Sequence, residues 1–211
     1  YGYTPAEHAV WVRRLLDELQ PDPVILVVQD WGGPIGLSIA VNQPERVAGI
    51  VLCNSWCWPP FLNAWLFSVA MGGLLGPWLQ LHHNFFARVM IPAGILGPAR
   101  KDAAVKKAYT DQFPTPDSRM GTYVFPREIR KSAAWLDGIQ QKLHLLADKP
   151  VEMVWAMKDP AFGKDNYVQK WLSHFPNAPV DRVANASHYI QEDSPERVAA
   201  AVDRVINRVS G

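Results

Sequence analysis

Cysteine is scarce in this sequence, and neither of its two cysteines stands in a metal-binding pattern. Cys53 and Cys57 lie four residues apart, with no histidine near them at the spacing that zinc requires. The adjacent pair His82 and His83 also lacks partner ligands, so we expect surface or packing positions for both. The sequence therefore predicts free, buried thiols, no metal centre, and a reducing compartment such as the cytoplasm.

Long apolar runs and an excess of one charge are absent as well. No run of about 18 apolar residues occurs, which argues against a membrane span, and the first residues do not resemble a signal peptide. The net charge is only +1, so neither a nucleic-acid partner nor a membrane surface is expected. A chain of 211 residues, 48% of them hydrophobic, predicts one soluble globular protein with a large core.

The most informative stretch lies between positions 24 and 37. Residues 24–28 form an aliphatic, mostly β-branched run, which is typical of a parallel strand buried on both faces. Asp30 and Trp31 interrupt that run, two glycines follow, and Pro34 suits the first turn of a helix. This order of strand, polar residue, small residues and helix is the layout of a nucleophile elbow.

Asp30 occupies the position that a nucleophile elbow would expose above the sheet. A nucleophilic carboxylate forms an alkyl ester rather than an acyl-enzyme, so its electrophile would be an sp³ carbon that carries a leaving group. Aspartate is also a favoured N-cap residue, and this turn alone does not separate the two roles. The rest of the chain has to decide between them.

The remaining pattern predicts an α/β fold with a mostly parallel sheet of about four strands. Helical periodicity and buried apolar runs alternate along the chain, apart from one long middle section. The predicted elements are a helix at 6–19 with an apolar stripe and a possible Thr4 cap, strands at 47–53, 151–157 and 179–183, and helices at 165–175 and 194–209.

The middle section, residues 55–148, contains probable helices and no strand pattern. It is far longer than an ordinary connection between two strands. We therefore predict a core domain formed by residues 1–54 and 149–211, with 55–148 inserted as a helical cap over the carboxyl edge of the sheet.

Two further residues complete a possible catalytic set. Asp159 follows the predicted strand at 151–157, and His188 follows the strand at 179–183. Nucleophile, acid and histidine thus come in the order typical of α/β-hydrolases, each just past a strand end. Trp31, directly after Asp30, carries an indole N–H that could donate to an anion in a dry pocket, although core packing is its alternative role.

These motifs resemble the haloalkane dehalogenases, which are α/β-hydrolases with a helical cap. The resemblance covers nearly the whole chain. It rests on VQDWGGPIG at 28–36, QFPTPDSR at 112–119, FPREI at 125–129, KDPAFG at 158–163, and Ser187 with His188.

The resemblance implies a reaction and a role for each residue. Asp30 would attack the halogen-bearing carbon, and the halide would leave toward the indole of Trp31. His188 would then activate the water that hydrolyses the ester, while Asp159 holds the imidazole. The partners would be a small halogenated substrate and a halide ion, with no cofactor. An Asp after the strand at 151–157 resembles the branches with a late catalytic acid, so Asn54 would not be the acid.

The chain departs from the family at its start. No segment corresponding to the first strands of the family, with their His-Gly-Asn-Pro type of loop, precedes the first predicted helix. We therefore expect an N-terminally truncated fragment that turns over weakly or not at all. The strand at 24–28 would form a sheet edge, which favours association into oligomers.

Two alternatives remain open. An epoxide hydrolase would use the same three residues together with two cap tyrosines, for which Tyr109 and Tyr123 are candidates. Gln29 argues against it, because those enzymes usually carry histidine before the nucleophile. The other alternative is a non-catalytic α/β-hydrolase fragment that binds a ligand or a partner protein.

Overall fold

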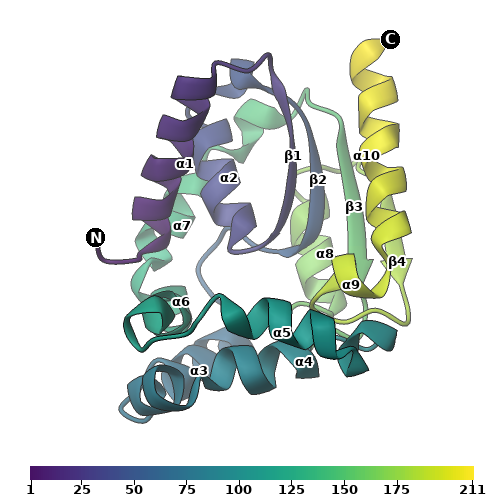
Figure 1. Ribbon diagram of the computed structural model, residues 1–211. Coiled ribbons are helices and arrows are strands. Elements are labelled where there is room, and N and C mark those ends of the chain that lie inside the picture. Colours follow the sequence, from purple (N-terminus) through teal and green to yellow (C-terminus); the bar gives the residue numbers. More distant parts are fainter.

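A single parallel sheet organises the molecule (Figure 1), in a computed structural model that describes residues 1–211. Its strand order is β1-β2-β3-β4, and every neighbouring pair is parallel. The strands are β1 (Val24–Asp30), β2 (Val47–Ser55), β3 (Val151–Ala156) and β4 (Val180–Val183). The α/β fold and the four-stranded parallel sheet predicted from the sequence are both confirmed.

The two inner strands are buried, whereas β1 forms an edge. All six residues of β3 are buried, but in β1 only Val28 is, and the Val27 side chain is 48% exposed. The prediction that residues 24–28 are buried on both faces is therefore wrong. The physical reason is that β1 has only one neighbouring strand, so part of its surface has nothing to pack against. This agrees with the expectation that the strand at 24–28 forms a sheet edge.

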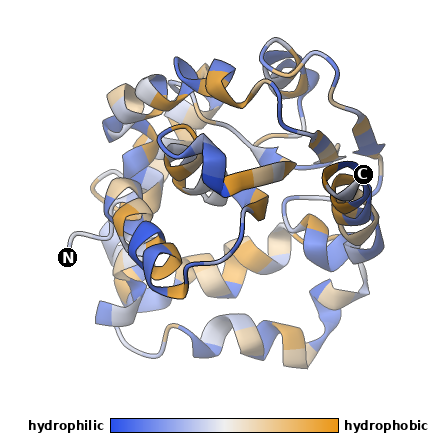
Figure 2. Ribbon diagram, turned by 90° about the horizontal axis from the view of Figure 1, so that it is seen from above, coloured by the Kyte–Doolittle hydropathy of each residue, from blue (hydrophilic) through white to orange (hydrophobic).

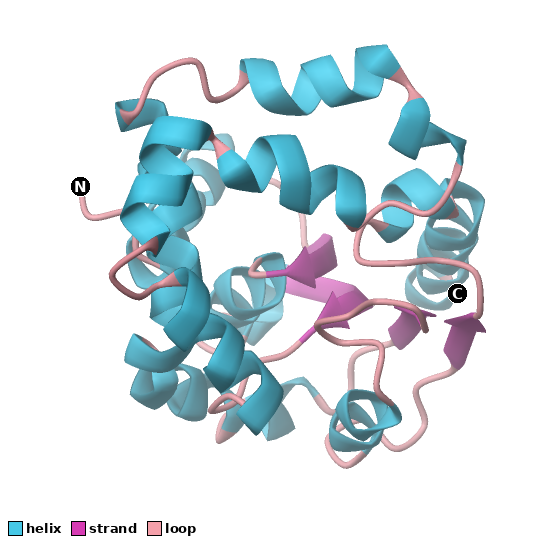
Figure 3. Cartoon of the chain, turned by 90° about the horizontal axis from the view of Figure 1, so that it is seen from below, coloured by secondary structure: helices cyan, strands magenta, loops and turns pink.

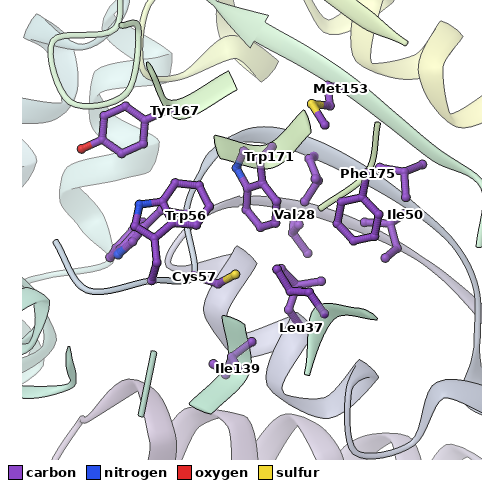
Figure 4. Packing of buried hydrophobic residues seen from close by; sticks show 14 of the residues in the cluster. Val28, Leu37, Ile50, Trp56, Cys57, Ile139, Met153, Tyr167, Trp171 and Phe175 are labelled. Carbon is purple, nitrogen blue, oxygen red and sulfur yellow. The ribbon is translucent and has the colours of Figure 1, made fainter. Parts of the chain in front are cut away.

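Alternating side chains of the inner strands serve two separate cores. Ile50 and Leu52 of β2 join the larger cluster with Leu37 and Trp171, as Figure 4 shows for several of its members. Val51, between them, belongs to the smaller cluster on the opposite face. This two-residue alternation is the signature of a strand that is covered on both faces.

Helices cover both faces of the sheet. The α2 helix (Gly32–Ala40) and α8 (Asp165–Leu172) contribute to the larger core, and α10 (Pro195–Ser210) supplies Ala201 and Val205 to the smaller one. In Figure 2 the strands lie in the middle of the molecule, and the surrounding helices carry both hydrophilic and hydrophobic stretches. The helix predicted at 165–175 is thus three residues shorter than expected.

The first helix has the predicted cap but not a buried stripe. Thr4 and Glu7 form a capping box at the start of α1 (Pro5–Leu19), as the sequence suggested. Its apolar stripe nevertheless lies at the surface, with Leu15 and Leu19 more than half exposed. The helix packs mainly on α2 through its other side, where Ala9 is buried.

Between β2 and β3 the chain forms helices only. Figures 1 and 3 show most of these helices lying across the carboxyl ends of the strands, whereas the last of them pack beside α2 and contribute to the larger core. The helices are α3 (Leu62–Met71), the π-helical turns η2 (Trp78–His82) and η3 (Phe86–Met90), α4 (Ile91–Ala93), η4 (Pro98–Lys101), α5 (Ala103–Asp111), η5 (Asp117–Arg119), α6 (Met120–Lys131), α7 (Ala133–Gln140) and η6 (Leu143–Leu146).

One buried arginine ties several of these turns together. The guanidinium of Arg119 donates to the carbonyl oxygens of Leu81, Phe113 and Pro114, at 2.7, 2.9 and 3.1 Å. Backbone carbonyls left open by short, irregular helices are thereby satisfied by a side chain rather than by a regular ladder. None of the helices in the chain is both long and apolar enough to cross a membrane.

Candidate active site

Asp30 lies at the tip of the sharp turn between β1 and α2. Its φ of 48° falls in the left-handed region, which a non-glycine residue adopts rarely and at an energetic cost. The N-cap position of α2 belongs to Trp31, and no side chain caps that helix, so the N-cap alternative for Asp30 is wrong. The Asp30 side chain is 35% exposed, which leaves it accessible from the carboxyl edge of the sheet.

Gly33, in the first turn of α2, allows the turn at Asp30 to pack closely against β2. A Cβ added to Gly33 would lie 1.8 Å from the hydroxyl oxygen of Ser55 at the end of β2. That hydroxyl donates a hydrogen bond of 2.7 Å to the backbone carbonyl of Asp30. The end of β2 therefore supports the strained turn directly, and only glycine fits between them.

Asp159 follows β3 and is completely enclosed. The backbone N–H of Ala161 donates to its Oδ1 at 2.7 Å, and the Asn54 amide donates to its Oδ2 at 3.0 Å. The same Asn54 side chain binds both the carbonyl and the N–H of Ala156, which fixes it between β2 and β3. A buried carboxylate with these donors has a defined orientation and keeps one direction free for a further partner.

His188 is that further partner. Its Nδ1 lies 3.0 Å from Asp159 Oδ2, and its Nε2 lies 4.0 Å from Asp30 Oδ2. The Gln29 side chain donates to the backbone carbonyl of His188 at 2.9 Å. The three residues that the sequence singled out on separate strand ends, Asp30, Asp159 and His188, are thus brought together at one edge of the sheet.

The charges of these groups act on one another. Burial alone would lower the pKa of His188, but the hydrogen bond and negative charge of Asp159, together with the charge of Asp30, raise it to about 9. Desolvation raises the pKa of Asp30, against the opposing effects of His188 and of a hydrogen bond from the Trp31 backbone. The carboxylate and the imidazolium thus favour each other's charged form.

Aromatic rings surround the carboxylate and the imidazole. Trp31 is buried, with its ring 4.7 Å from that of Trp56 and 5.6 Å from that of Phe125. Phe162 stacks on Trp56 and on His188, at 5.1 and 5.9 Å between ring centroids. The Trp56 indole N–H is buried without a hydrogen-bond partner, which is a costly arrangement for a donor.

The two candidate cap tyrosines are already engaged. Tyr109 donates its hydroxyl hydrogen to Glu192 at 2.7 Å, and burial and Glu192 raise its pKa further above the ordinary value. Tyr123 lies under the guanidinium of Arg127, which also donates to the tyrosine hydroxyl at 3.4 Å. The hydroxyl hydrogen of Tyr109 is therefore committed to Glu192, and the hydroxyl oxygen of Tyr123 accepts from Arg127.

The possible metal and thiol residues lie apart from this site. Both His82 and His83 are exposed, and His83 packs on Trp78 with 4.2 Å between ring centroids. Cys53 and Cys57 are free and buried, as predicted, and burial raises the pKa of the Cys53 thiol to about 12. No cluster of three or more histidine, cysteine, aspartate or glutamate side chains is suited to hold a metal ion.

Several supporting residues were not identified from the sequence. Asn54 orients Asp159, Gln29 binds the histidine backbone, and Ser55 supports the elbow. Asp193 accepts the backbone N–H of Ser187, next to the histidine, at 2.7 Å. The sequence signal was weak, because each of these residues acts through a partner that is distant in the chain or through a backbone atom.

Comparisons with known proteins show which family this fold belongs to. A family model described as alpha/beta hydrolase fold matches residues 1–195. The haloalkane dehalogenase 2 of Mycobacterium tuberculosis is 35% identical, with 96% of this chain and 71% of the relative covered. A cis-3-alkyl-4-alkyloxetan-2-one decarboxylase of Xanthomonas campestris pv. campestris is 31% identical, with 99% of this chain and 71% of the relative covered.

Solved structures give the same fold. The crystal structure of the haloalkane dehalogenase DbeA from Bradyrhizobium elkani matches with a TM-score of 0.87 and 22% sequence identity. That match covers all of this chain and 76% of the solved chain.

Proposed function

Because the chain belongs to the α/β-hydrolase fold family and, within it, to the haloalkane dehalogenases, we propose that it hydrolyses carbon–halogen bonds of haloalkanes through an ester of Asp30. The single observation that carries this proposal is that Asp30, His188 and Asp159 lie together at one edge of the sheet. A carboxylate on a strained turn lies 4.0 Å from an imidazole, whose other nitrogen is held by the buried Asp159. Carboxylate attack followed by ester hydrolysis requires this set of groups.

In the first step, an oxygen of ionised Asp30 attacks the sp³ carbon. The new C–O bond forms as the C–halogen bond breaks, and the halide leaves with the bonding electrons. We assign Trp31 as an indole donor toward that halide, in accordance with its burial beside the elbow. The indole N–H of the neighbouring Trp56 is also buried and has no hydrogen-bond partner.

In the second step, neutral His188 removes a proton from water, and the resulting hydroxide attacks the carboxyl carbon of the Asp30 ester. The bond between the carboxyl carbon and the alkoxy oxygen breaks, and that oxygen takes the proton of the added hydroxyl group and departs as the alcohol. Asp30 is regenerated as a carboxylate, and His188 releases its proton to solvent. Esterification removes the negative charge that helps to raise the pKa of His188, so the base loses its proton more readily at this stage. Asp159 keeps the proton on Nδ1 and leaves Nε2 as the basic nitrogen.

We further propose that residues 55–148 act as the cap of residues 1–54 and 149–211. The helices between β2 and β3 lie over the strand ends, in the position of a cover for the site (Figure 3). Phe125 of α6 packs on Trp31, so this segment supplies part of the apolar wall beside Asp30. An apolar haloalkane gains by transfer from water into such an environment.

Trapping of the ester tests the mechanism. The chain with His188→Phe is incubated with 1,2-dibromoethane, and its mass is then measured intact and after digestion. We expect one bromoethyl group on the peptide that carries Asp30, together with one equivalent of bromide, because attack does not need the base. A chain that remains unmodified, or a label on another residue, contradicts the proposal.

A second candidate is supported by one of the relatives. The oxetan-2-one ring of the decarboxylase substrate contains an sp³ carbon bonded to a carboxyl oxygen, which a carboxylate nucleophile could attack in the same geometry. Incubation with a 3,4-dialkyl oxetan-2-one separates the candidates. Release of carbon dioxide and an alkene without halide turnover favours the decarboxylase, and halide release favours the dehalogenase.

The epoxide hydrolase alternative is less favoured. It requires phenol donors, whereas the hydroxyl of Tyr109 is committed to Glu192 and that of Tyr123 lies beside Arg127. Incubation with styrene oxide tests the epoxide hydrolase alternative. Diol formation at a rate comparable to halide release would favour that alternative again.

A further inference from the structure

One carboxylate outside the triad contacts both the histidine loop and the cap. Asp193 ends the short helix α9 (Ile190–Asp193), five residues after His188. Its Oδ2 accepts the backbone N–H of Ser187 at 2.7 Å. Its Oδ1 accepts the backbone N–H groups of Leu96 and Gly97, at 2.8 and 2.7 Å.

The backbone around His188 is held at three consecutive residues. Asp193 binds the N–H of Ser187, the Gln29 amide binds the carbonyl of His188, and the carbonyl of Gly94 binds the N–H of Tyr189 at 3.2 Å. The first of these contacts comes from α9, the second from β1 and the third from the cap. The position of the imidazole therefore depends on where the cap lies relative to the core.

Close packing supports the same connection. A Cβ added to Gly94 would lie 2.9 Å from two ring carbons of Tyr189 and 3.3 Å from the Cβ of His188. Gly97, which donates to Asp193, is also closely packed. A Cβ added to Gly97 would lie 3.2 Å from Oδ1 of Asp193. The cap backbone thus touches the histidine loop without room for a side chain.

From these contacts we infer that Asp193 is a positioning residue, which fixes the His188 loop to the cap and so orients the base for ester hydrolysis. This inference rests on the proposed function of the site. Backbone N–H groups bound to an ionised carboxylate form stronger hydrogen bonds than neutral pairs, so one side chain can hold both segments. Attack by Asp30 does not involve the base, so the two chemical steps respond differently to loss of Asp193.

The chemical test compares four variants of the whole chain. In Asp193→Asn the side-chain NH₂ group replaces one of the two acceptor oxygens and cannot accept from a backbone N–H. The contact with either Ser187 or the pair Leu96 and Gly97 is therefore lost. In Gly94→Ala the histidine loop is displaced from the cap side while Asp193 stays intact. The controls are Asp181→Asn, which removes an ion pair with Arg197, and Gly138→Ala, whose added Cβ meets nothing within 4 Å.

Rapid mixing with 1,2-dibromoethane measures ester formation and ester hydrolysis separately. We expect hydrolysis to slow on the order of 10- to 100-fold in Asp193→Asn and Gly94→Ala, with ester formation little changed and ester accumulating. The controls should resemble the parent chain. Equal loss in both steps indicates a merely structural role, and no loss in either step also overturns the inference.

A measurement that needs no turnover keeps this inference separate from the proposed function. The imidazole of His188 is titrated by NMR in the parent chain and in both test variants. We expect its pKa to fall from about 9 toward the ordinary value when the loop moves away from Asp159. An unchanged titration in both variants overturns the inference, even if the parent chain releases no halide.

Discussion

The sheet core and the helical segment that covers it are held together in different ways. In the core, β2 and β3 are buried and their residues alternate between two hydrophobic clusters. In the segment between β2 and β3, Leu74 is fully exposed, Leu75 is 71% exposed, and two of the turns are π-helical. The segment has only a small hydrophobic cluster of its own, formed by Ala87, Ile91 and Ile95, and side chains bound to carbonyl groups, Arg119 above all, add to it.

This difference separates two kinds of function. The core carries Asp30, Asp159 and His188 just past the ends of neighbouring strands, which brings the three side chains to one edge of the sheet. The covering segment contributes apolar wall and contacts to the histidine loop through individual hydrogen bonds. Changes in the core should therefore affect the chemical steps, and changes in the cover away from the histidine loop should affect substrate binding and stability.

The largest expected effect is at the nucleophile. Asp30→Ala should lower halide release by at least about 10⁴-fold, because it removes the carboxylate proposed to attack the substrate carbon. The melting temperature should not fall, since the substitution removes a carboxylate whose raised pKa reports unfavourable burial. Ion chromatography for halide and thermal unfolding monitored by circular dichroism measure the two quantities. Substantial residual turnover would place the nucleophile elsewhere.

The catalytic acid should come next. Asp159→Asn should slow ester hydrolysis by about 10²- to 10⁴-fold, because the amide no longer selects the useful tautomer. The pKa of His188 should fall from about 9 toward 6.5 once that charge and hydrogen bond are gone. Rate against pH and an NMR titration record both effects, and an unchanged pKa contradicts the assigned pairing.

The pairing of His188 with Asp159 also predicts how the stability of the folded chain depends on pH. The folded-state pKa of His188 lies above its unfolded value, so the folded chain binds more protons between about pH 6.5 and 9. The stabilisation is therefore complete below about pH 6.5 and is lost as the pH rises through 9. Urea unfolding across this range should show a decline of a few kcal/mol in the parent chain and a smaller one in Asp159→Asn.

The elbow glycine should have an intermediate effect. Gly33→Ala forces its Cβ against Ser55, so the turn has to move and Asp30 with it; a loss of about 10²-fold in ester formation is expected. Gly32→Ala is the matched control, because its added Cβ meets nothing within 4 Å. Single-turnover bromide release compares the two variants, and equal rates would remove the argument for close approach at Gly33.

The cover should respond in binding and stability. Arg119→Met leaves three carbonyl groups without their donor, which should lower the free energy of unfolding by about 2–4 kcal/mol. The KM should rise more than kcat falls, since the triad is not touched. Urea unfolding and steady-state kinetics test this, and a kcat loss as large as that of Asp159→Asn would break the distinction between core and cover.

The smallest effect is expected at the exposed face of the cover. Leu74→Ser changes a side chain that is fully exposed, so stability should stay within about 0.5 kcal/mol and turnover should be unaffected. Thermal unfolding and halide release are the measurements. A clear loss in either would mean that this leucine packs against a partner in solution.

Much of the core and the central site could be predicted from local pattern. Strand ends, two glycines and the order of Asp30, Asp159 and His188 were sufficient to propose the elbow and the triad, because parallel strands bring their carboxyl ends to one edge. The aliphatic run of β1 was misread as buried on both faces, and the apolar stripe of α1 lies at the surface. Periodicity identifies an apolar face, but it does not tell whether another element covers that face.

The sequence by itself determined which elements form and which chemical groups stand at their ends. Only the tertiary structure decided which groups support them: Asn54 on Asp159, Gln29 on the backbone of His188, and Asp193 between the histidine loop and the cap. Those contacts join residues that are distant in the chain, or join a side chain to a backbone atom. Neither kind leaves a periodic trace in the sequence, because a backbone N–H or carbonyl is the same at every position.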